Sequence, residues 1–395
     1  MPQKKPEYTV TFGGWYQRTT LHLTEIYDLF ALGRSGLKLD SQKLQELHQN
    51  LKFVSVTREW GDLEYIVCQT REGIAVRYYE DGLYVLSLNT SDIAAGQHTL
   101  RHYFDTCLSP AISYIFSLGA PTPKILAKIK PDHPFVVSSI SSPSSRGGGR
   151  LRRPEGFGPI YSQITSSHIT VSKTPSTIYI FSPSNFSHLR DLIEMQIFFR
   201  EFKDQLHRYL NLHREIWEEI SDIKERGVII GTQIETLRSR LDSYQKTINL
   251  IKSRLNQMGA YVHTRASLAR KLSLEDQLAS VFQYKFETLS DTHSYVQEIW
   301  KMTQDYVETA IAVVNEVKGR SSSNGINSLR LITTIGVLSG IFSYLSKDTF
   351  PVFTWIGLWY FLILVIGTYL IDQLVSSTYK KYRYQLKFAN NQGIK

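Results

Sequence analysis

Two long apolar runs close to the C-terminal end of the chain place the strongest constraint on what it folds into. They cover residues 329–345 and 352–375, and only the short polar link "SKDTFP" separates them. A helix needs roughly twenty apolar residues to cross a bilayer. The second run has this length and the first is at the short end of the range. The pattern therefore predicts a two-helix transmembrane hairpin at residues 328–376.

The charges that flank the hairpin predict its orientation. Basic residues lie before or at the start of the first run and after the second: Lys318, Arg320, Arg330, Lys380, Lys381, Arg383 and Lys387. Basic flanks stay on the cytoplasmic side, and the start "MPQKKPEYTVTFGGWY" has no apolar core of signal-peptide length. We therefore expect a multi-pass protein of the inner (plasma) membrane, with both termini cytoplasmic and residues 377–395 as a basic tail.

Residues 1–184 have the pattern of a cytoplasmic α/β domain. "FVSVTREW", "LEYIVCQT", "GIAVRYYEDGLYVLSL" and "STIYIFS" are rich in β-branched and aromatic residues at strand length. Asp81-Gly82 lies between two such runs and predicts a tight hairpin. "SDIAAGQHTLRHYFDTCLSPAISYIFSLG" is typical of a helix, with Ser91 or Asp92 as its N-cap. The predicted fold class is α+β.

Residues 185–327 are predicted to form long stalk helices with coiled-coil seams. Apolar residues recur there at steps of four and three, which is the a/d pattern of a coiled coil. The first series is Ile230, Ile234, Leu237, Leu241, Tyr244, Ile248, Ile251, Leu255 and Met258. The second is Phe282, Phe286, Leu289, His293, Val296, Trp300, Thr303, Val307, Ala310, Val314 and Val317.

The sequence offers few candidates for metal or catalytic chemistry. His293 has two interpretations, a metal ligand or pH sensor and a hydrogen-bonded core histidine, and the second is the commoner. Cys68 and Cys107 stand alone without a CxxC or Cys/His cluster, so we expect no structural zinc. The nucleotide-binding, zinc-protease and serine-hydrolase motifs are missing. We therefore expect no enzyme and no catalytic residues, and the identity of any bound metal stays unknown.

A low-complexity stretch, "SSISSPSSRGGGRLRRPEGFG", interrupts the first domain. Its arginines are candidate contacts for an anionic ligand, although a solvated loop is the commoner reading: Arg146, Arg150, Arg152 and Arg153. The whole chain has a formal charge of +9, which fits anionic ligands or lipid without choosing between them. We expect no direct binding of nucleic acid.

The first apolar run differs from the second in its small and polar residues. Gly336 and Gly340 form G-x-x-x-G, which allows close helix packing. Residues at steps of three or four predict one pore-lining face: Asn327, Arg330, Thr334, Val337, Ile341 and Tyr344. In that arrangement Val337 and Ile341 close the path by dewetting. A plain two-helix anchor is the alternative.

At these residues the chain resembles the CorA family of divalent-cation channels, and the order of its parts matches over nearly the whole length. "SSNGINSLRLITTIG" is similar to the family's entry into its first span, with Asn327 as the inner pore amide and Thr333 as the conserved threonine. The resemblance implies a homopentamer that moves Mg²⁺ or another divalent cation. The family's outer Gly-Met-Asn signature is replaced here, since Leu345, Ser346 and Lys347 follow Tyr344.

Two functions follow from the resemblance, and a third stands beside them. The first is a CorA-like ion channel gated by its cytoplasmic domain, with altered selectivity at an outer mouth formed by Ser346, Lys347 and Asp348. The second is a signal-gated membrane effector of a prokaryotic antiviral defence system, activated when a nucleotide messenger binds the soluble domain. The third is an anchored scaffold without a pore.

Overall fold

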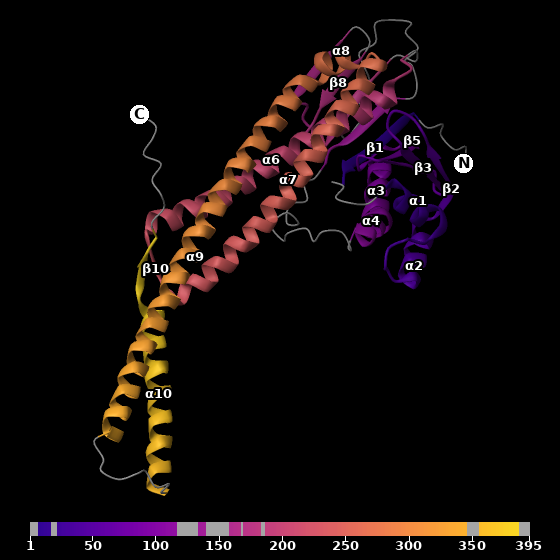
Figure 1. Ribbon diagram of the computed structural model, residues 1–395. Coiled ribbons are helices and arrows are strands. Elements are labelled where there is room, and N and C mark those ends of the chain that lie inside the picture. The colour runs from indigo at the N-terminus through magenta and orange to yellow at the C-terminus, as the bar shows by residue number, and fades with distance from the viewer. Residues whose placement is uncertain are drawn as a thin grey trace, which may run out of the picture. The chain divides into compact units, whose positions relative to one another are not determined.

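The computed structural model describes residues 7–16, 22–116, 133–139, 158–166, 169–182, 186–345 and 355–386 (Figure 1). The chain forms two compact units. Unit 1 comprises Met1–Leu212 and Leu250–Glu298, and unit 2 comprises His213–Asn249 and Ile299–Lys395. Long helices contribute residues to both units, and each unit is described below on its own.

Unit 1 contains a nine-stranded mixed sheet within the described residues. The strand order is β2-β3-β4-β5-β1-β6-β9-β8-β7, and only the β6–β9 pair is parallel among the pairs described. The strands are β1 Tyr8–Trp15, β2 Phe53–Glu59, β3 Tyr65–Thr70, β4 Ala75–Tyr79, β5 Leu83–Thr90, β6 Phe135–Ser139, β7 Ser162–Thr165, β8 Thr170–Lys173 and β9 Thr177–Phe181. The four runs predicted as strands are confirmed.

The described helices range from single turns to α9 of 60 residues. They are α1 Leu23–Leu32, α2 Ser41–Leu51, α3 Ile93–Tyr103, the π-helix η1 Phe104–Leu108, α4 Ser109–Ile115, α6 Leu189–Arg226, the 3₁₀-helix η3 Gly231–Gln233, α7 Ile234–Lys271, α8 Glu275–Gln277, the π-helix η4 Leu278–Phe282, α9 Phe286–Leu345 and α10 Trp355–Lys381. The strands β10 Val228–Ile230 and β11 Arg383–Gln385 belong to unit 2. Of the two predicted N-cap candidates Ser91 and Asp92, Asp92 caps α3, because its side chain accepts a hydrogen bond from the Ala95 amide.

The main core of unit 1 lies between one face of the sheet and helices α1–α4 (Figure 1). Val10 and Phe12 of β1 point to this face and pack with Ile26 of α1, Leu100 of α3 and Ile112 of α4. All five are at most 1% exposed. Alternation along the strand sends every second side chain to the opposite face, which therefore needs a cover of its own.

The first half of α6 provides that cover. Trp15 of β1 stacks on Phe202 with ring centroids 5.5 Å apart. Gly13 allows the close approach, since a Cβ at this position would lie 3.2 Å from side-chain carbons of Ile197 and 2.8 Å from the Tyr84 carbonyl oxygen. The helix therefore lies directly against the backbone of β1.

The predicted hairpin at Asp81-Gly82 joins β4 to β5, and it carries a buried ion pair. Gly82 has a φ of +88°, a conformation that favours glycine. Arg265 of α7 donates from Nε to Asp81 Oδ2 over 2.8 Å, with both side chains at most 1% exposed. Burial opposes the arginine charge, but the charge and hydrogen bond of Asp81 outweigh it and raise the pKa of Arg265. The hairpin is thus fixed to α7 inside unit 1.

Unit 2 has a smaller apolar core beneath a two-stranded ribbon. β11 pairs antiparallel with β10, so that Ile229 lies opposite Tyr384. These two residues and Leu386 pack with Leu241 of α7 and Val314 of α9. The ribbon therefore joins the connection between α6 and α7 to the chain that follows α10.

The surroundings of His213 in unit 2 lead us to expect that stability falls in acid. Its ring stacks on Trp217 at 5.8 Å and meets Trp300 edge-on at 6.1 Å. Burial, and then the charge of Arg214, lower its pKa below 6.5. The folded state therefore binds this proton less tightly than the unfolded state does, and stability falls as the pH drops through 6.5.

We expect a His213→Asn variant to lose less stability than the wild type between pH 7 and pH 5 in urea titrations. His263→Asn, at an exposed position on α7, is the control and should follow the wild type. Equal pH dependence of the His213 variant and the wild type would refute the assignment.

The predicted transmembrane hairpin is wrong. Within the described residues, no helix combines the length and the apolarity that crossing a bilayer requires. The first run is short and lies at the end of a helix that also carries Arg330, Thr333 and Thr334. The second belongs to α10, which includes Asp372 and continues to Lys381. The expected multi-pass placement in the inner membrane, with both termini cytoplasmic, is overturned by the same finding.

The predicted helical seams are largely confirmed as buried stripes. On α7, Leu241, Ile248, Ile251 and Leu255 are all 0% exposed. On α9, the buried seam positions are Leu289, His293, Val296, Trp300, Thr303, Val307, Ala310, Val314 and Val317. Two predicted members lie outside these helices, since Ile230 ends β10 and Phe282 ends the π-helix η4.

Candidate metal centre

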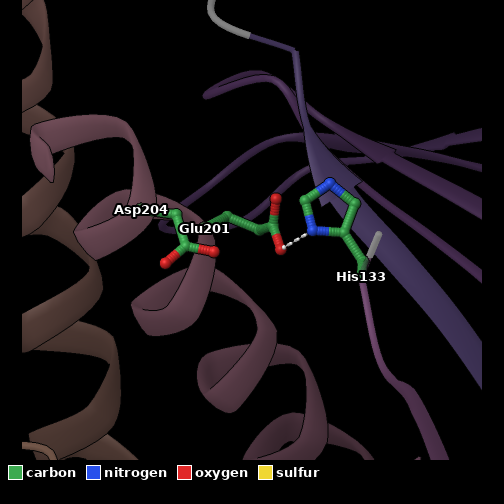
Figure 2. Close-up of side chains that lie close together, drawn as sticks. All are labelled: His133, Glu201 and Asp204. Carbon is green, nitrogen blue, oxygen red and sulfur yellow. Dashed lines mark ion pairs between the residues drawn. The ribbon is translucent and has the colours of Figure 1, made fainter. Parts of the chain in front are cut away.

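Three side chains with metal-ligating atoms meet between the sheet and α6 in unit 1. They are His133, Glu201 and Asp204, and their candidate ligand atoms all lie within 4.8 Å of one another. Figure 2 shows the His133 ring facing the Glu201 carboxylate, with Asp204 projecting from the same helix as Glu201. The Nδ1 atom of His133 is 2.8 Å from Oε1 of Glu201. These three residues are called the metal-ligand cluster below.

Local structure explains why the three residues meet. Glu201 and Asp204 are three residues apart on α6, so they share one helix face. His133 precedes Pro134, and a residue before proline is held in extended conformation. Phe135 then begins β6, which pairs with β1 through Val136 and Thr11. Through this pairing, His133 lies next to β6 at the face of the sheet that α6 covers.

Arg200 braces the cluster from its neighbouring position on α6. Its two terminal nitrogens donate to the carbonyl oxygens of Pro134 and Gly13, each over 3.0 Å. Its Nε donates to Oε1 of Glu201 over 2.8 Å. One guanidinium therefore joins α6 to β1 and to the segment that carries His133. It also fixes the Glu201 carboxylate, as outer-shell partners of metal ligands commonly do.

The metal-ligand cluster contains two carboxylates that are largely shielded from water. The Glu201 side chain is 5% exposed and that of His133 is 13% exposed. Burial, and then the negative charge of Glu201, raise the pKa of Asp204, although Arg200, His133 and Arg208 pull it down. A bound cation would relieve this repulsion between carboxylates.

The donor set indicates which ions fit. One imidazole with two carboxylates suits Zn²⁺, Mn²⁺, Co²⁺ or Fe²⁺ better than Mg²⁺, which prefers oxygen ligands and water. Nδ1 of His133 is buried and makes no bond of hydrogen-bond geometry with any residue that the structure describes, although it is close to Glu201. Metal bonds of about 2.0–2.2 Å place ligand atoms roughly 3.4 Å apart in a tetrahedron. The candidate ligand atoms, all within 4.8 Å of one another, have a wider upper limit than that spacing.

The predicted pore-lining residues all belong to α9, away from this cluster in sequence. Arg330, Thr334 and Val337 are exposed there. The backbones of Asn327, Ile341 and Tyr344 are helical, and their side chains lie outside the description. The outer-mouth residues and the loop arginines lie outside the described residues altogether: Ser346, Lys347, Asp348, Arg146, Arg150, Arg152 and Arg153.

His293 is the hydrogen-bonded core histidine of the second interpretation. Its ring is 7% exposed, and Nε2 donates to the Leu255 carbonyl oxygen over 2.6 Å. Cys68 is buried, and burial alone raises the pKa of its thiol. Neither residue belongs to the metal-ligand cluster.

Sequence reasoning missed every member of the cluster. The pair Glu201 and Asp204 reads E-x-x-D on a long helix, a signal that many solvated helix faces share. His133 lies in "KPDHPF" and has no spacing that ties it to α6. The antiparallel pairing of β6 with β1 and the packing of α6 on β1 bring these segments together.

Comparisons of the chain with protein-family models, with curated proteins and with solved structures find no match. The resemblance to the CorA family therefore rests on the sequence features given above.

Proposed function

We propose that this chain is a divalent transition-metal-binding protein, in which the ion joins the segment before β6 to α6. The observation that carries the proposal is the convergence of His133, Glu201 and Asp204 from two distant segments. As in the prediction from sequence, the bound species in this proposal is a divalent cation. It leaves out the transmembrane channel, because no described helix fits a bilayer crossing.

The ion's role follows from what its ligands connect. His133 leads into the sheet, and both carboxylates lie on the helix that covers it. A shared ion stabilises that contact and leaves open coordination positions for water. Arg200 holds the same elements in the absence of metal. Metal occupancy therefore adjusts the stability of the contact between α6 and the sheet, which suits a metal-responsive regulatory role.

Zinc is expected to raise the melting temperature of the full-length chain after chelator treatment and desalting. A free ligand at a hundred times its Kd stabilises by about 2.7 kcal/mol. For a unit of this size each kcal/mol shifts Tm by about 2–4 °C, so the expected rise is about 5–10 °C. Mn²⁺ should act similarly and Mg²⁺ much less. Differential scanning calorimetry measures all three.

Asp204→Asn is the decisive variant. Removing one of two neighbouring carboxylates relieves repulsion, so the metal-free protein should keep or gain stability while the zinc-induced shift falls below 2 °C, about a quarter of the wild-type value. His188→Gln is the matched control, because His188, just before α6, lies 3.2 Å from Asp191 with no third metal-ligating side chain among the described residues. A full zinc shift in Asp204→Asn, or none in the wild type, would refute the proposal.

A further inference from the structure

Unit 2 contains a cavity that the metal-ligand cluster does not explain. Its volume is about 290 Å³, close to the lower end of the range for small-molecule sites. It lies where the end of α6, the strand β10 and the first turns of α7 meet, with Leu386 after β11 as a further wall. All of these segments belong to unit 2.

Most of the lining is apolar. Ile223 of α6, Val228 and Ile229 around β10, Leu237 of α7 and Leu386 contribute to it. Val228 is 44% exposed, although its neighbour Ile229 is only 6% exposed. Part of the cavity lining is therefore exposed apolar surface, which an aliphatic group of a ligand would bury.

Charged groups of both signs line the same cavity. Glu219 is already engaged, since Nε of Arg240 forms an ion pair with its Oε1 at 2.6 Å and Tyr244 donates a hydrogen bond to its other oxygen. The two terminal nitrogens of Arg240 are not used in that contact. Asp222, one turn along α6, has no hydrogen bond or ion pair with a described residue and is exposed at the cavity. The Asp222 carboxylate and the terminal N–H donors of Arg240 thus remain for a ligand.

The geometry points to a small amphipathic zwitterion as the ligand of this cavity, of the class of α-amino acids with aliphatic side chains. Asp222 accepts hydrogen bonds from the ammonium group, and Arg240 donates to the carboxylate through its terminal nitrogens. The apolar wall of Ile223, Leu237 and Leu386 holds the aliphatic side chain. Neither the metal-ligand cluster nor its proposed ion takes part in this site.

Three probes of similar size test the assignment by isothermal titration calorimetry with the full-length chain. L-leucine carries both charges, isoamylamine only the ammonium group and 4-methylpentanoate only the carboxylate. We expect leucine to bind at least tenfold more tightly than either other probe. Its methyl signals should also show the strongest saturation transfer by NMR, because they contact the apolar wall.

Two variants separate the two charged contacts. Asp222→Asn should weaken leucine and isoamylamine at least tenfold and leave 4-methylpentanoate unchanged. Arg240→Gln should weaken leucine and 4-methylpentanoate and leave isoamylamine unchanged. Glu225→Gln on α6 and Arg238→Gln on α7 are the controls, since neither residue lines the cavity.

Three results would overturn the inference. They are no binding of leucine to the wild type at millimolar concentration, leucine binding that survives both variants, and tighter binding of either single-charge probe than of leucine. Since Asp222 and Arg240 are exposed, the variants are expected to fold, and circular dichroism verifies this.

Discussion

Replacing Asp81 by alanine is expected to lower the free energy of unfolding by about 3–5 kcal/mol, because it leaves Arg265 as an unpaired buried charge. The Arg265 side chain is only 1% exposed, so water does not solvate its charge. Its guanidinium carbon also lies 4.5 Å from the ring centroid of Tyr79 and 5.2 Å from that of Phe198. Urea titration followed by circular dichroism measures the loss.

Asp81 also shapes the hairpin, so a second variant separates charge from turn geometry. Its Oδ1 accepts a hydrogen bond from the Leu83 amide over 3.0 Å. Asparagine keeps an oxygen for this bond, so Asp81→Asn combined with Arg265→Met removes both charges and preserves the turn. We expect the double variant to recover at least half of the loss, because apolar replacement of a buried pair is often close to neutral.

The control for this prediction is an ion pair on the surface of the same unit. Lys271 lies 2.7 Å from Asp62, and the two side chains are 67% and 49% exposed. Asp62→Ala should change stability by less than about 1 kcal/mol. If Asp81→Ala costs no more than Asp62→Ala, the buried pair does not hold the hairpin on α7.

Truncation of Trp300 to alanine should cost about 3–5 kcal/mol, the usual loss for a fully buried tryptophan. The residue is 0% exposed and lies on the seam of α9 in unit 2. Its Nε1 has no hydrogen-bond partner among the described residues. Trp300→Phe should therefore cost much less than Trp300→Ala, because it removes volume but breaks no bond.

Chemical denaturation that monitors unit 2 tests this order. Trp355→Ala on α10 is the control, since this side chain is 80% exposed and its loss should stay within about 0.5 kcal/mol. A phenylalanine variant as unstable as the alanine variant would show that the indole N–H has a partner and that volume alone does not decide the cost.

The parts of the fold that follow from local pattern were predictable. Steps of four and three residues put Leu241, Ile248 and Leu255 on one helix face whatever the tertiary structure, and that face is buried. The pair Asp81-Gly82 predicted its hairpin for the same reason, because positive φ is a local requirement.

The parts that depend on contacts across the chain were not predictable. Arg265 and Asp81 are separated by 184 positions. No local sequence pattern around either residue indicates that the other is its partner. The same holds for His133 and Glu201. The apolar runs at residues 329–345 and 352–375 led to a wrong prediction of a membrane hairpin. Neither α9 nor α10 meets the length and apolarity that a bilayer crossing requires. Assembly into a homopentamer stays a prediction.

The ribbon of β10 and β11 has a consequence for the order in which a newly made chain folds. Unit 1 has received all its residues once Glu298 has left the ribosome. Unit 2 must wait, because Tyr384 and Leu386 complete a core that Ile229 and Ile234 began. Pairings between such distant positions are slow to form, so nascent chains arrested before residue 383 should carry a finished first unit and an open second one.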